Sequence, residues 1–383
     1  MTLSASQTSL RVPFFDLDYD ESEERAILEV LQSKWISMGP RTEEFEKRFA
    51  QALGAKHAVA VSNCTAALHL SMILIGVGPG DEVVVPSLTF VATAACVKMV
   101  GAKPVFADVS SLDDWRISPR EIEDKITPRT KAIIPMHYGG EGADMKKIME
   151  IAREKKLFVV EDACHAPLGE IEGGKLGTFG ELGCFSFYSN KNLSTGEGGM
   201  LVTDSDEYAE RARLLRAHGM TTSARQRHEG QEFYEVLEHG FNYRMDDLRS
   251  CLGLVQLEKL PERMKRRSEI ASRYHKQLSN QKGLRLPENE RKPSSVHHLF
   301  TVLLDEGIDR AGFRAHMRKL GVDTSMHYPP VHMFTGFNEQ GVPLPVTEEV
   351  GKRSVSLPIF NQISNQQIDY VCDSVSKTLK ELS

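Results

Sequence analysis

The sequence has no apolar run that could cross a bilayer and no excess of positive charge. Apolar stretches such as Val83–Val85 are far shorter than the roughly 20 residues that a membrane-spanning helix needs. The formal net charge of the 383 residues is -6, which argues against a nucleic-acid surface built from clustered Lys and Arg. Residues 1–12 lack the apolar core of a signal peptide. We therefore expect a cytoplasmic protein without nucleic-acid or membrane partners.

Cysteines are few, and none has a spacing typical of a metal site. The chain has six cysteines, with no CxxC pair and no dense disulfide framework. Cys164 and His165 are adjacent, which is not a zinc-ligand spacing, so no metal site is predicted. Free thiols in a reducing compartment are the default for such a chain.

What the sequence does contain is an alternation of short apolar runs with helical patterns. With 40% hydrophobic and 26% charged residues, the composition is that of a globular enzyme with a large domain and a smaller one. Strands are expected at 58–61, 82–86, 104–106, 132–135 and 157–160. Helices are expected at 22–32, 43–53, 65–74, 91–100 and 145–155, with Ser22 as a possible cap of the first. This alternation indicates mostly parallel strands with helices on both faces.

After Gln256 the pattern changes to that of a smaller α+β domain. A long charged helix is followed by a strand at 299–304 and by helices at 311–320 and 366–382. The basic run 265–267 lies on this helix and is interpreted as a solvated face. We predict three segments: a tail (1–13), a large domain (14–256) and a small C-terminal domain (257–383). The polar loop 221–238 is a candidate for a mobile or substrate-facing segment.

Two stretches carry the strongest chemical information. The run LFVVEDACH at 157–165 stops on acidic residues, and FSFYSNK at 185–191 precedes a glycine-rich turn at 196–199. Asp162, at the end of a buried strand, can hold a proton on a heterocyclic nitrogen, and Lys191 can form a Schiff base with an aldehyde. Pyridoxal phosphate requires this pair of roles. Taken singly, Asp162 could instead cap a helix, and Lys191 could be a solvated surface charge.

A strand-to-helix junction supplies a candidate phosphate site. The expected strand 58–61 leads directly into a helix that opens at Ser62 to Thr65. Free amides and the positive helix end favour an anion there, so the amides of Cys64 and Thr65 and the Thr65 hydroxyl are candidate donors. Ser62 or Asn63 could also be a simple N-cap, and both interpretations are compatible.

These stretches, together with GFNYRM at 240–245, resemble the sugar-aminotransferase branch of the fold-type-I pyridoxal-phosphate enzymes, the DegT/DnrJ/EryC1/StrS family. The resemblance covers nearly the whole chain. It implies that Ser186 contacts the cofactor phosphate, that Phe90 stacks on the pyridine ring, and that His165 bonds near the phenolic oxygen. It also implies that Asn242 reaches the phosphate bound by a partner subunit, in a homodimer with shared sites. Without the resemblance, Phe90 would be read as a core residue and His165 as a satisfied histidine at a helix start.

The resemblance further implies a fold and a reaction. The fold would be an aspartate-aminotransferase-like three-layer αβα domain with a mostly parallel sheet, plus the smaller α+β domain. The enzyme would be a transaminase that moves an amino group, from L-glutamate, to a keto group of a nucleotide-linked sugar. Family members that dehydrate or deoxygenate sugars carry histidine at the place of Lys191. A cyclitol or other cyclic-ketone aminotransferase, or a non-catalytic cofactor-binding regulator, are the alternatives, and His327 is assigned no chemical role.

Overall fold

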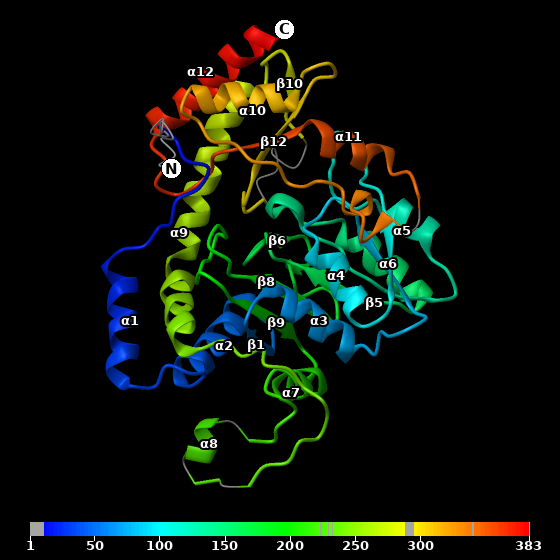
Figure 1. Ribbon diagram of the computed structural model, residues 1–383, viewed down its shortest axis with the longest axis vertical. Coiled ribbons are helices and arrows are strands. Elements are labelled where there is room, and N and C mark those ends of the chain that lie inside the picture. The colour runs from blue at the N-terminus through cyan, green and yellow to red at the C-terminus, as the bar shows by residue number, and fades with distance from the viewer. Residues whose placement is uncertain are drawn as a thin grey trace, which may run out of the picture.

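A seven-stranded sheet covered by helices forms the centre of the molecule. A second, three-stranded sheet lies toward the end of the molecule that carries the C-terminus (Figure 1). The structure is a computed structural model, and it describes residues 11–222, 224–228, 230–231, 233–287, 295–338 and 341–382. Most of the predicted N-terminal tail, residues 1–10, lies outside these residues. The expected α/β architecture with two sheets of different kinds is confirmed.

One strand of the large sheet runs against all the others. In spatial order the sheet consists of β1 (His57–Val61), β9 (Gly199–Thr203), β8 (Leu182–Ser186), β5 (Phe158–Asp162), β4 (Thr130–Ile133), β2 (Glu82–Pro86) and β3 (Lys103–Ala107). β9 is antiparallel to β1 and to β8, and the remaining neighbours are parallel. The C-terminal ends of every strand except β9 therefore meet at one edge of the sheet, where parallel α/β folds bind ligands.

Both faces of the sheet are buried, because alternate residues of each strand point to opposite sides. Val59 and Val61 of β1 pack in one cluster, whereas Ala58 and Ala60 pack in another on the opposite face. The first face is covered by α3 (Cys64–Leu74), α4 (Ala92–Met99) and α7 (Asp206–Leu215). The second face is covered by α2 (Pro40–Leu53), α5 (Pro119–Lys125), α6 (Met145–Lys155) and the first part of α9 (Asp247–Leu278).

The smaller sheet has its own core. It consists of β10 (Leu284–Arg285), β11 (Phe300–Leu304) and β12 (Ser354–Leu357), and α10 (Arg310–Lys319) and α12 (Asn365–Leu382) pack beside it.

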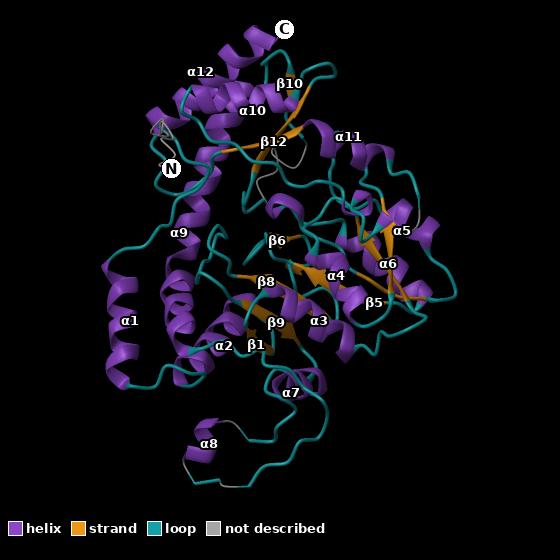
Figure 2. Cartoon of the chain, in the orientation of Figure 1, coloured by secondary structure: helices purple, strands orange, loops and turns teal. Residues whose placement is uncertain are grey.

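The remaining elements are α1 (Glu21–Ser33), β6 (Glu170–Ile171), β7 (Gly174–Lys175), α8 (Ala224–His228), α11 (Pro345–Arg353) and the 3-10 turns Tyr138–Gly140 and Val331–Met333. Figure 2 shows α8 on a long excursion that projects from the body of the molecule. The predicted division at residue 256 falls inside α9, and no helix among the described residues could span a membrane.

Two local expectations are wrong. Asp20, not Ser22, caps α1, because its carboxylate accepts from the Ser22 amide and Glu23 completes a capping box. The run 265–267 is not a uniformly solvated face, since Arg267 is only 5% exposed. Its Nη1 donates to the carbonyl oxygens of His297 (2.8 Å) and His298 (3.4 Å), so it fastens the segment before β11 to α9.

Glu161 is fully buried near the end of β5, and its side chain binds the backbone of a neighbouring loop. Its carboxylate accepts from the backbone amides of Gly177 (2.8 Å), Phe179 (2.6 Å) and Gly180 (2.9 Å). His137 Nε2 lies 3.0 Å away and is the donor, because His137 Nδ1 already accepts from the backbone amide of residue 143. A buried carboxylate with four donors is stabilised by charge-assisted hydrogen bonds.

Replacing Glu161 with Ala leaves these buried donors without an acceptor, so we expect Glu161→Ala to lower the free energy of unfolding by about 3 kcal/mol or more. Chemical denaturation at fixed protein concentration measures this loss. Glu172→Ala, an exposed position of the same loop region, is the control and should stay within about 0.5 kcal/mol of the unmodified protein. Equal losses for the two variants would contradict this account.

Candidate active site

Asp162 is the last residue of β5, and its carboxylate is held rigidly at the C-terminal edge of the sheet. It is 2% exposed, with Oδ2 accepting from Thr93 Oγ1 at 2.7 Å and Oδ1 accepting from the Cys164 amide at 3.2 Å. Thr93 lies in the first turn of α4, and its Oγ1 is also 2.7 Å from Thr89 Oγ1. No helix begins directly after Asp162, since the next elements of the chain are the short strands β6 and β7, so the alternative of a helix cap is excluded.

Lys191 lies on the loop that follows β8 and is half-buried, not a freely solvated charge. Its backbone amide donates to the Tyr188 carbonyl at 2.9 Å, which shapes the loop. Burial is the main cause that lowers the pKa of His165, His298 and His327, and the neighbouring Lys191 ammonium lowers each pKa further. Three uncharged imidazoles therefore lie near Lys191.

His165 is fully buried in a turn after β5, not at a helix start. Its Nδ1 accepts from the Gly139 amide at 3.2 Å, and its Nε2 lies 2.8 Å from the Tyr328 hydroxyl. The His298 ring lies 4.2 Å from the His165 ring, centroid to centroid, and His298 Nδ1 is 3.2 Å from Asn192 Oδ1. His165 is thus held from several sides by segments that are distant in sequence.

The predicted phosphate site is assembled from three segments. Asn63 caps α3 by accepting from the Ala66 amide at 2.9 Å, and the amides of Cys64 and Thr65 stay at the open positive end of the helix. Ser186 pairs with Gly199 across β8 and β9. These contacts place the Ser186 end of β8 beside the first turn of α3.

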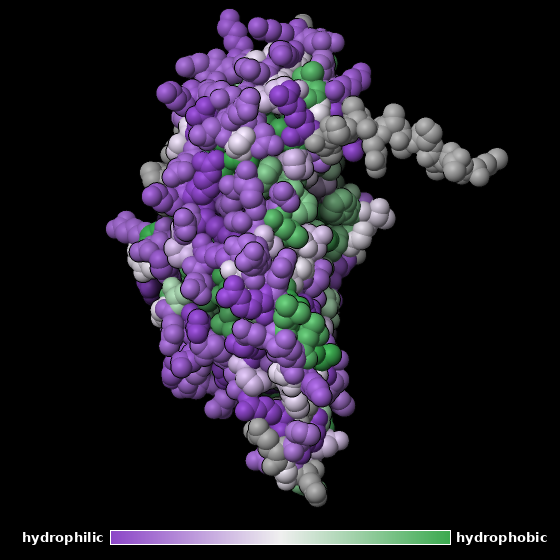
Figure 3. All heavy atoms as spheres, turned by 90° about the vertical axis from the view of Figure 1, so that its left-hand side faces the viewer, coloured by the Kyte–Doolittle hydropathy of each residue, from purple (hydrophilic) through white to green (hydrophobic). Residues whose placement is uncertain are grey.

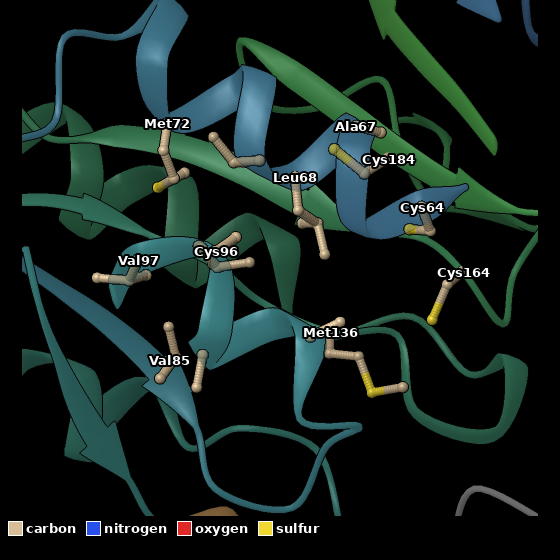
Figure 4. Packing of buried hydrophobic residues seen from close by; sticks show 14 of the residues in the cluster. Cys64, Ala67, Leu68, Met72, Val85, Cys96, Val97, Met136, Cys164 and Cys184 are labelled. Atoms are coloured by element: carbon tan, nitrogen blue, oxygen red, sulfur yellow. The ribbon is translucent and has the colours of Figure 1, made fainter. Parts of the chain in front are cut away.

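Gly199 makes this close approach possible. A Cβ at this position would lie 2.4 Å from the Asn63 carbonyl carbon and 2.7 Å from the Cys64 amide nitrogen, closer than real side chains come. The backbone of β9 can therefore pack directly against the first turn of α3, which a residue with a side chain at this position would prevent. Figure 4 shows Cys64 on the first turn of α3, with Cys164 and Cys184 in the same buried cluster. Burial raises the pKa of the Cys64 thiol well above its usual value, so Cys64 offers its amide and no thiolate.

Phe90 is 53% exposed, so the alternative of a core phenylalanine is excluded. Its ring centroid is 6.0 Å from that of Tyr328. An exposed aromatic face beside buried polar groups is what a stacked planar ligand requires.

Asn242 is not brought into the site by the described single chain. Its side chain is exposed, and the adjacent Tyr243 accepts from the Ser62 amide at 2.7 Å. The segment therefore runs beside the start of α3, while the reach of Asn242 to a partner stays a prediction.

Sequence reasoning missed Thr93, Tyr328, Asn192 and His298. Thr93 carries the helical spacing of α4 and gave no separate signal, whereas Asn192 directly follows Lys191. Tyr328 and His298 come from the C-terminal third of the chain, and only the folded structure brings them to the edge of the large sheet.

The model of the DegT/DnrJ/EryC1/StrS aminotransferase family matches residues 17–376. The chain belongs to this family. Spore coat polysaccharide biosynthesis protein SpsC of Bacillus subtilis (strain 168) is 40% identical over 94% of this chain and 95% of SpsC. GDP-perosamine synthase of Escherichia coli O157:H7 is 34% identical over 96% of this chain and 98% of the synthase. The PLP form of Spr1654 from Streptococcus pneumoniae superimposes with a TM-score of 0.90 at 26% identity, covering 97% of this chain and 99% of that chain.

Family membership identifies the protein as a pyridoxal-phosphate-dependent aminotransferase, as the sequence resemblance indicated. The site fits this cofactor on its own geometry. An exposed aromatic ring, a rigid buried carboxylate and a half-buried lysine lie at one sheet edge, beside a helix N-terminus against which the backbone of Gly199 packs.

Thr93→Val removes the hydroxyl that orients Asp162 while preserving the shape of the side chain. A hydrogen bond to a charged group contributes about 1.5–3 kcal/mol, so we expect cofactor affinity to fall by about tenfold or more. Equilibrium dialysis of the apoprotein against pyridoxal phosphate measures the change. Thr93→Ser keeps the hydroxyl and is the matched control; an equal loss in both variants would show that the hydroxyl is not responsible.

Proposed function

We propose that this aminotransferase moves an amino group from L-glutamate to a keto group on a nucleotide-linked sugar. The observation that carries the proposal is the half-buried Lys191 among uncharged imidazoles, at the same sheet edge as the supported Asp162 carboxylate. Family members of the dehydrating type would need histidine at this place. The names of two full-length relatives, one a GDP-perosamine synthase and one a polysaccharide biosynthesis protein, support a sugar substrate.

The roles of the residues follow from their chemistry. When bound, pyridoxal phosphate supplies an aldehyde that can carry an amino group and a ring that accepts electrons. Asp162 would hold a proton on the ring nitrogen, since its carboxylate is fixed by two donors and cannot turn away. Lys191 would bind the aldehyde and, once freed, carry a proton to and from the reacting carbon.

The remaining residues would hold and orient the cofactor. Ser186 and the amides of Cys64 and Thr65 would bind the phosphate, and Phe90 would cover one face of the ring. His165 would form a hydrogen bond near the phenolic oxygen of the cofactor.

We also infer a homodimer in which Asn242 reaches the partner's phosphate. Asn242 is exposed in the single chain. The face that carries α1 shows hydrophobic patches among hydrophilic atoms (Figure 3). Leu28, Leu31 and Ile36 are each about half exposed in this region, which is consistent with burial against a second copy.

The absorption spectrum of the loaded enzyme is the decisive test of the function. Glutamate alone should bleach the visible band, and a nucleotide-linked keto sugar should then restore it with release of an amino sugar. A free cyclitol ketone that restores the band in place of every keto sugar tested would favour the alternative substrate class. A band that ignores amino donors altogether would favour a binding protein without turnover.

Lys191→Ala should abolish transamination while leaving the fold intact, because no other amine is expected to replace its covalent and proton-carrying roles. Multiple-turnover assays over several hours, with circular dichroism as the check on folding, measure this. Lys175→Ala, which removes a surface lysine paired with Glu170, is the control and should keep full activity. Retained turnover in Lys191→Ala would remove the assigned role.

Shared sites predict complementation between two inactive variants. In a mixture of Lys191→Ala and Asn242→Ala subunits, one site of each mixed dimer combines an intact Lys191 with the partner's intact Asn242. After random reassociation of equal amounts we expect about one quarter of the unmodified activity, because half of the dimers are mixed. Activity equal to the average of the two separate variants would contradict shared sites.

A further inference from the structure

Asn192 directly follows Lys191, is buried, and uses both ends of its side-chain amide. It is only 4% exposed. Its Nδ2 donates to the Val296 carbonyl at 3.0 Å, and its Oδ1 lies 3.2 Å from His298 Nδ1. Both partners belong to the segment that precedes β11, 104 and 106 residues further along the chain.

These three groups fix one another's hydrogen positions. The Val296 carbonyl can only accept, so it selects the orientation of the Asn192 amide in which Nδ2 faces it. Oδ1 then faces His298 and can only accept, so His298 Nδ1 carries the hydrogen. Burial, with smaller effects of His165 and Lys191, lowers the pKa of His298 well below its usual value, so the ring is neutral and has this one hydrogen.

Few other hydrogen bonds tie this part of the loop to the rest of the described chain. The Tyr19 hydroxyl donates to the Ser194 carbonyl at 3.0 Å, three residues after Lys191. On the other side of Lys191, Asn190 Oδ1 has no hydrogen-bond partner among the described residues. The Asn192 amide is therefore the hydrogen-bonded link to a distant segment that lies nearest to Lys191.

The segment that receives these bonds is itself firmly held. Arg267 of α9 donates to the carbonyls of His297 and His298, and the Val296 amide donates to the Gly140 carbonyl at 3.1 Å. The φ angle of His297 is 45°, in the left-handed region that residues with a side chain seldom adopt. Such a conformation persists where surrounding contacts enforce it, so the segment is a fixed anchor for the loop.

We propose that Asn192 is a positioning residue, which ties the Lys191 loop to the segment before β11 and so holds the Lys191 amine where proton transfer requires it. This inference rests on the proton-carrying role proposed above for Lys191. Because its amide faces Val296 and His298, Asn192 acts through the loop backbone. A misplacement of about 1 Å is enough to lower the rate of a chemical step strongly.

Hydrogen exchange of the apoprotein tests the tie without the cofactor. Asn192→Ala leaves the Val296 carbonyl and His298 Nδ1 without a partner, so the hydrogen-bonded amides of Lys191 and Thr195 should exchange about tenfold faster or more. Asn190→Ala, which removes the unpaired asparagine on the other side of Lys191, is the matched control and should leave them unchanged. Unchanged exchange in Asn192→Ala would overturn the proposal.

Asn192→Asp is a second variant of nearly the same shape. It keeps an acceptor toward His298 but places an oxygen against the Val296 carbonyl, where a donor is needed. It should show the same faster exchange, with circular dichroism confirming that the overall fold is retained.

Single-turnover kinetics of the loaded enzyme test the positioning role. At saturating glutamate, the rate of bleaching per loaded molecule should fall by about tenfold or more in both Asn192 variants. The glutamate concentration at half-maximal rate should change by less than about twofold, because Asn192 acts on the chemical step and not on binding. A structural defect alone would lower the number of loaded molecules and leave the rate of each unchanged, and that result would overturn the proposal. An equal fall in Asn190→Ala would also overturn it.

Failure of this inference can be told apart from failure of the proposed function. If the band of the unmodified enzyme ignores glutamate, the proposed function fails, and the positioning role fails with it. If the unmodified enzyme bleaches normally and the Asn192 variants keep the full rate, this inference alone is refuted.

Discussion

The site depends on the way in which β5 ends on two adjacent buried acids. Strand geometry sends Glu161 and Asp162 to opposite faces of the sheet. Glu161 collects the amides of the following loop and the His137 ring, which fixes the strand end, while Asp162 is held by Thr93 on the other side. A buried carboxylate is costly unless it is fully paired, so each acid enforces the local structure around it. The precise placement of Asp162 is therefore a property of the packing on both faces.

The same sheet edge explains how residues from distant parts of the chain come together. Because every strand but β9 points in one direction, the segments that follow β1, β2, β5 and β8 all open at one side. The segments after β1 and β2 carry Cys64 and Phe90, and the last residues of β5 and β8 are Asp162 and Ser186. Tyr328 and His298 follow α9 in the chain, and both contact His165. The site therefore contains residues from the large sheet's edge and from the part of the chain after α9.

Much of the large domain could be predicted from the sequence because its strands are apolar runs with glycine or proline nearby. The helix 145–155 and the strand 82–86 are found with the expected bounds. The sequence pattern does not predict β8 and β9 as strands. Gly183 interrupts the apolar pattern of β8, and Gly199 is the first residue of β9. The residues around them are noticed only as parts of motifs. Antiparallel insertion of β9 depends on long-range pairing with β1, which no local pattern encodes.

At one edge of the sheet, loops, strand ends and the first turn of α3 carry the predicted site residues Asp162, Lys191, His165, Ser186, Cys64, Thr65 and Phe90. Their hydrogen-bond partners could not be predicted in the same way. Thr93 and Tyr328 act through single side-chain contacts whose donors and acceptors exist only after packing. The buried state of Arg267 was missed for a related reason: its partners are the carbonyls of a segment 30 residues away along the chain.

The contact of Arg267 with that segment has a mechanical consequence. α9 is a single helix of 32 residues that starts against the large sheet and ends in the core of the small domain. Arg267 of this helix donates hydrogen bonds to the carbonyl oxygens of His297 and His298, and the His298 ring contacts the His165 ring. Because α9 packs in both cores, a shift of the small domain against the large sheet would displace His298 and its contact with His165.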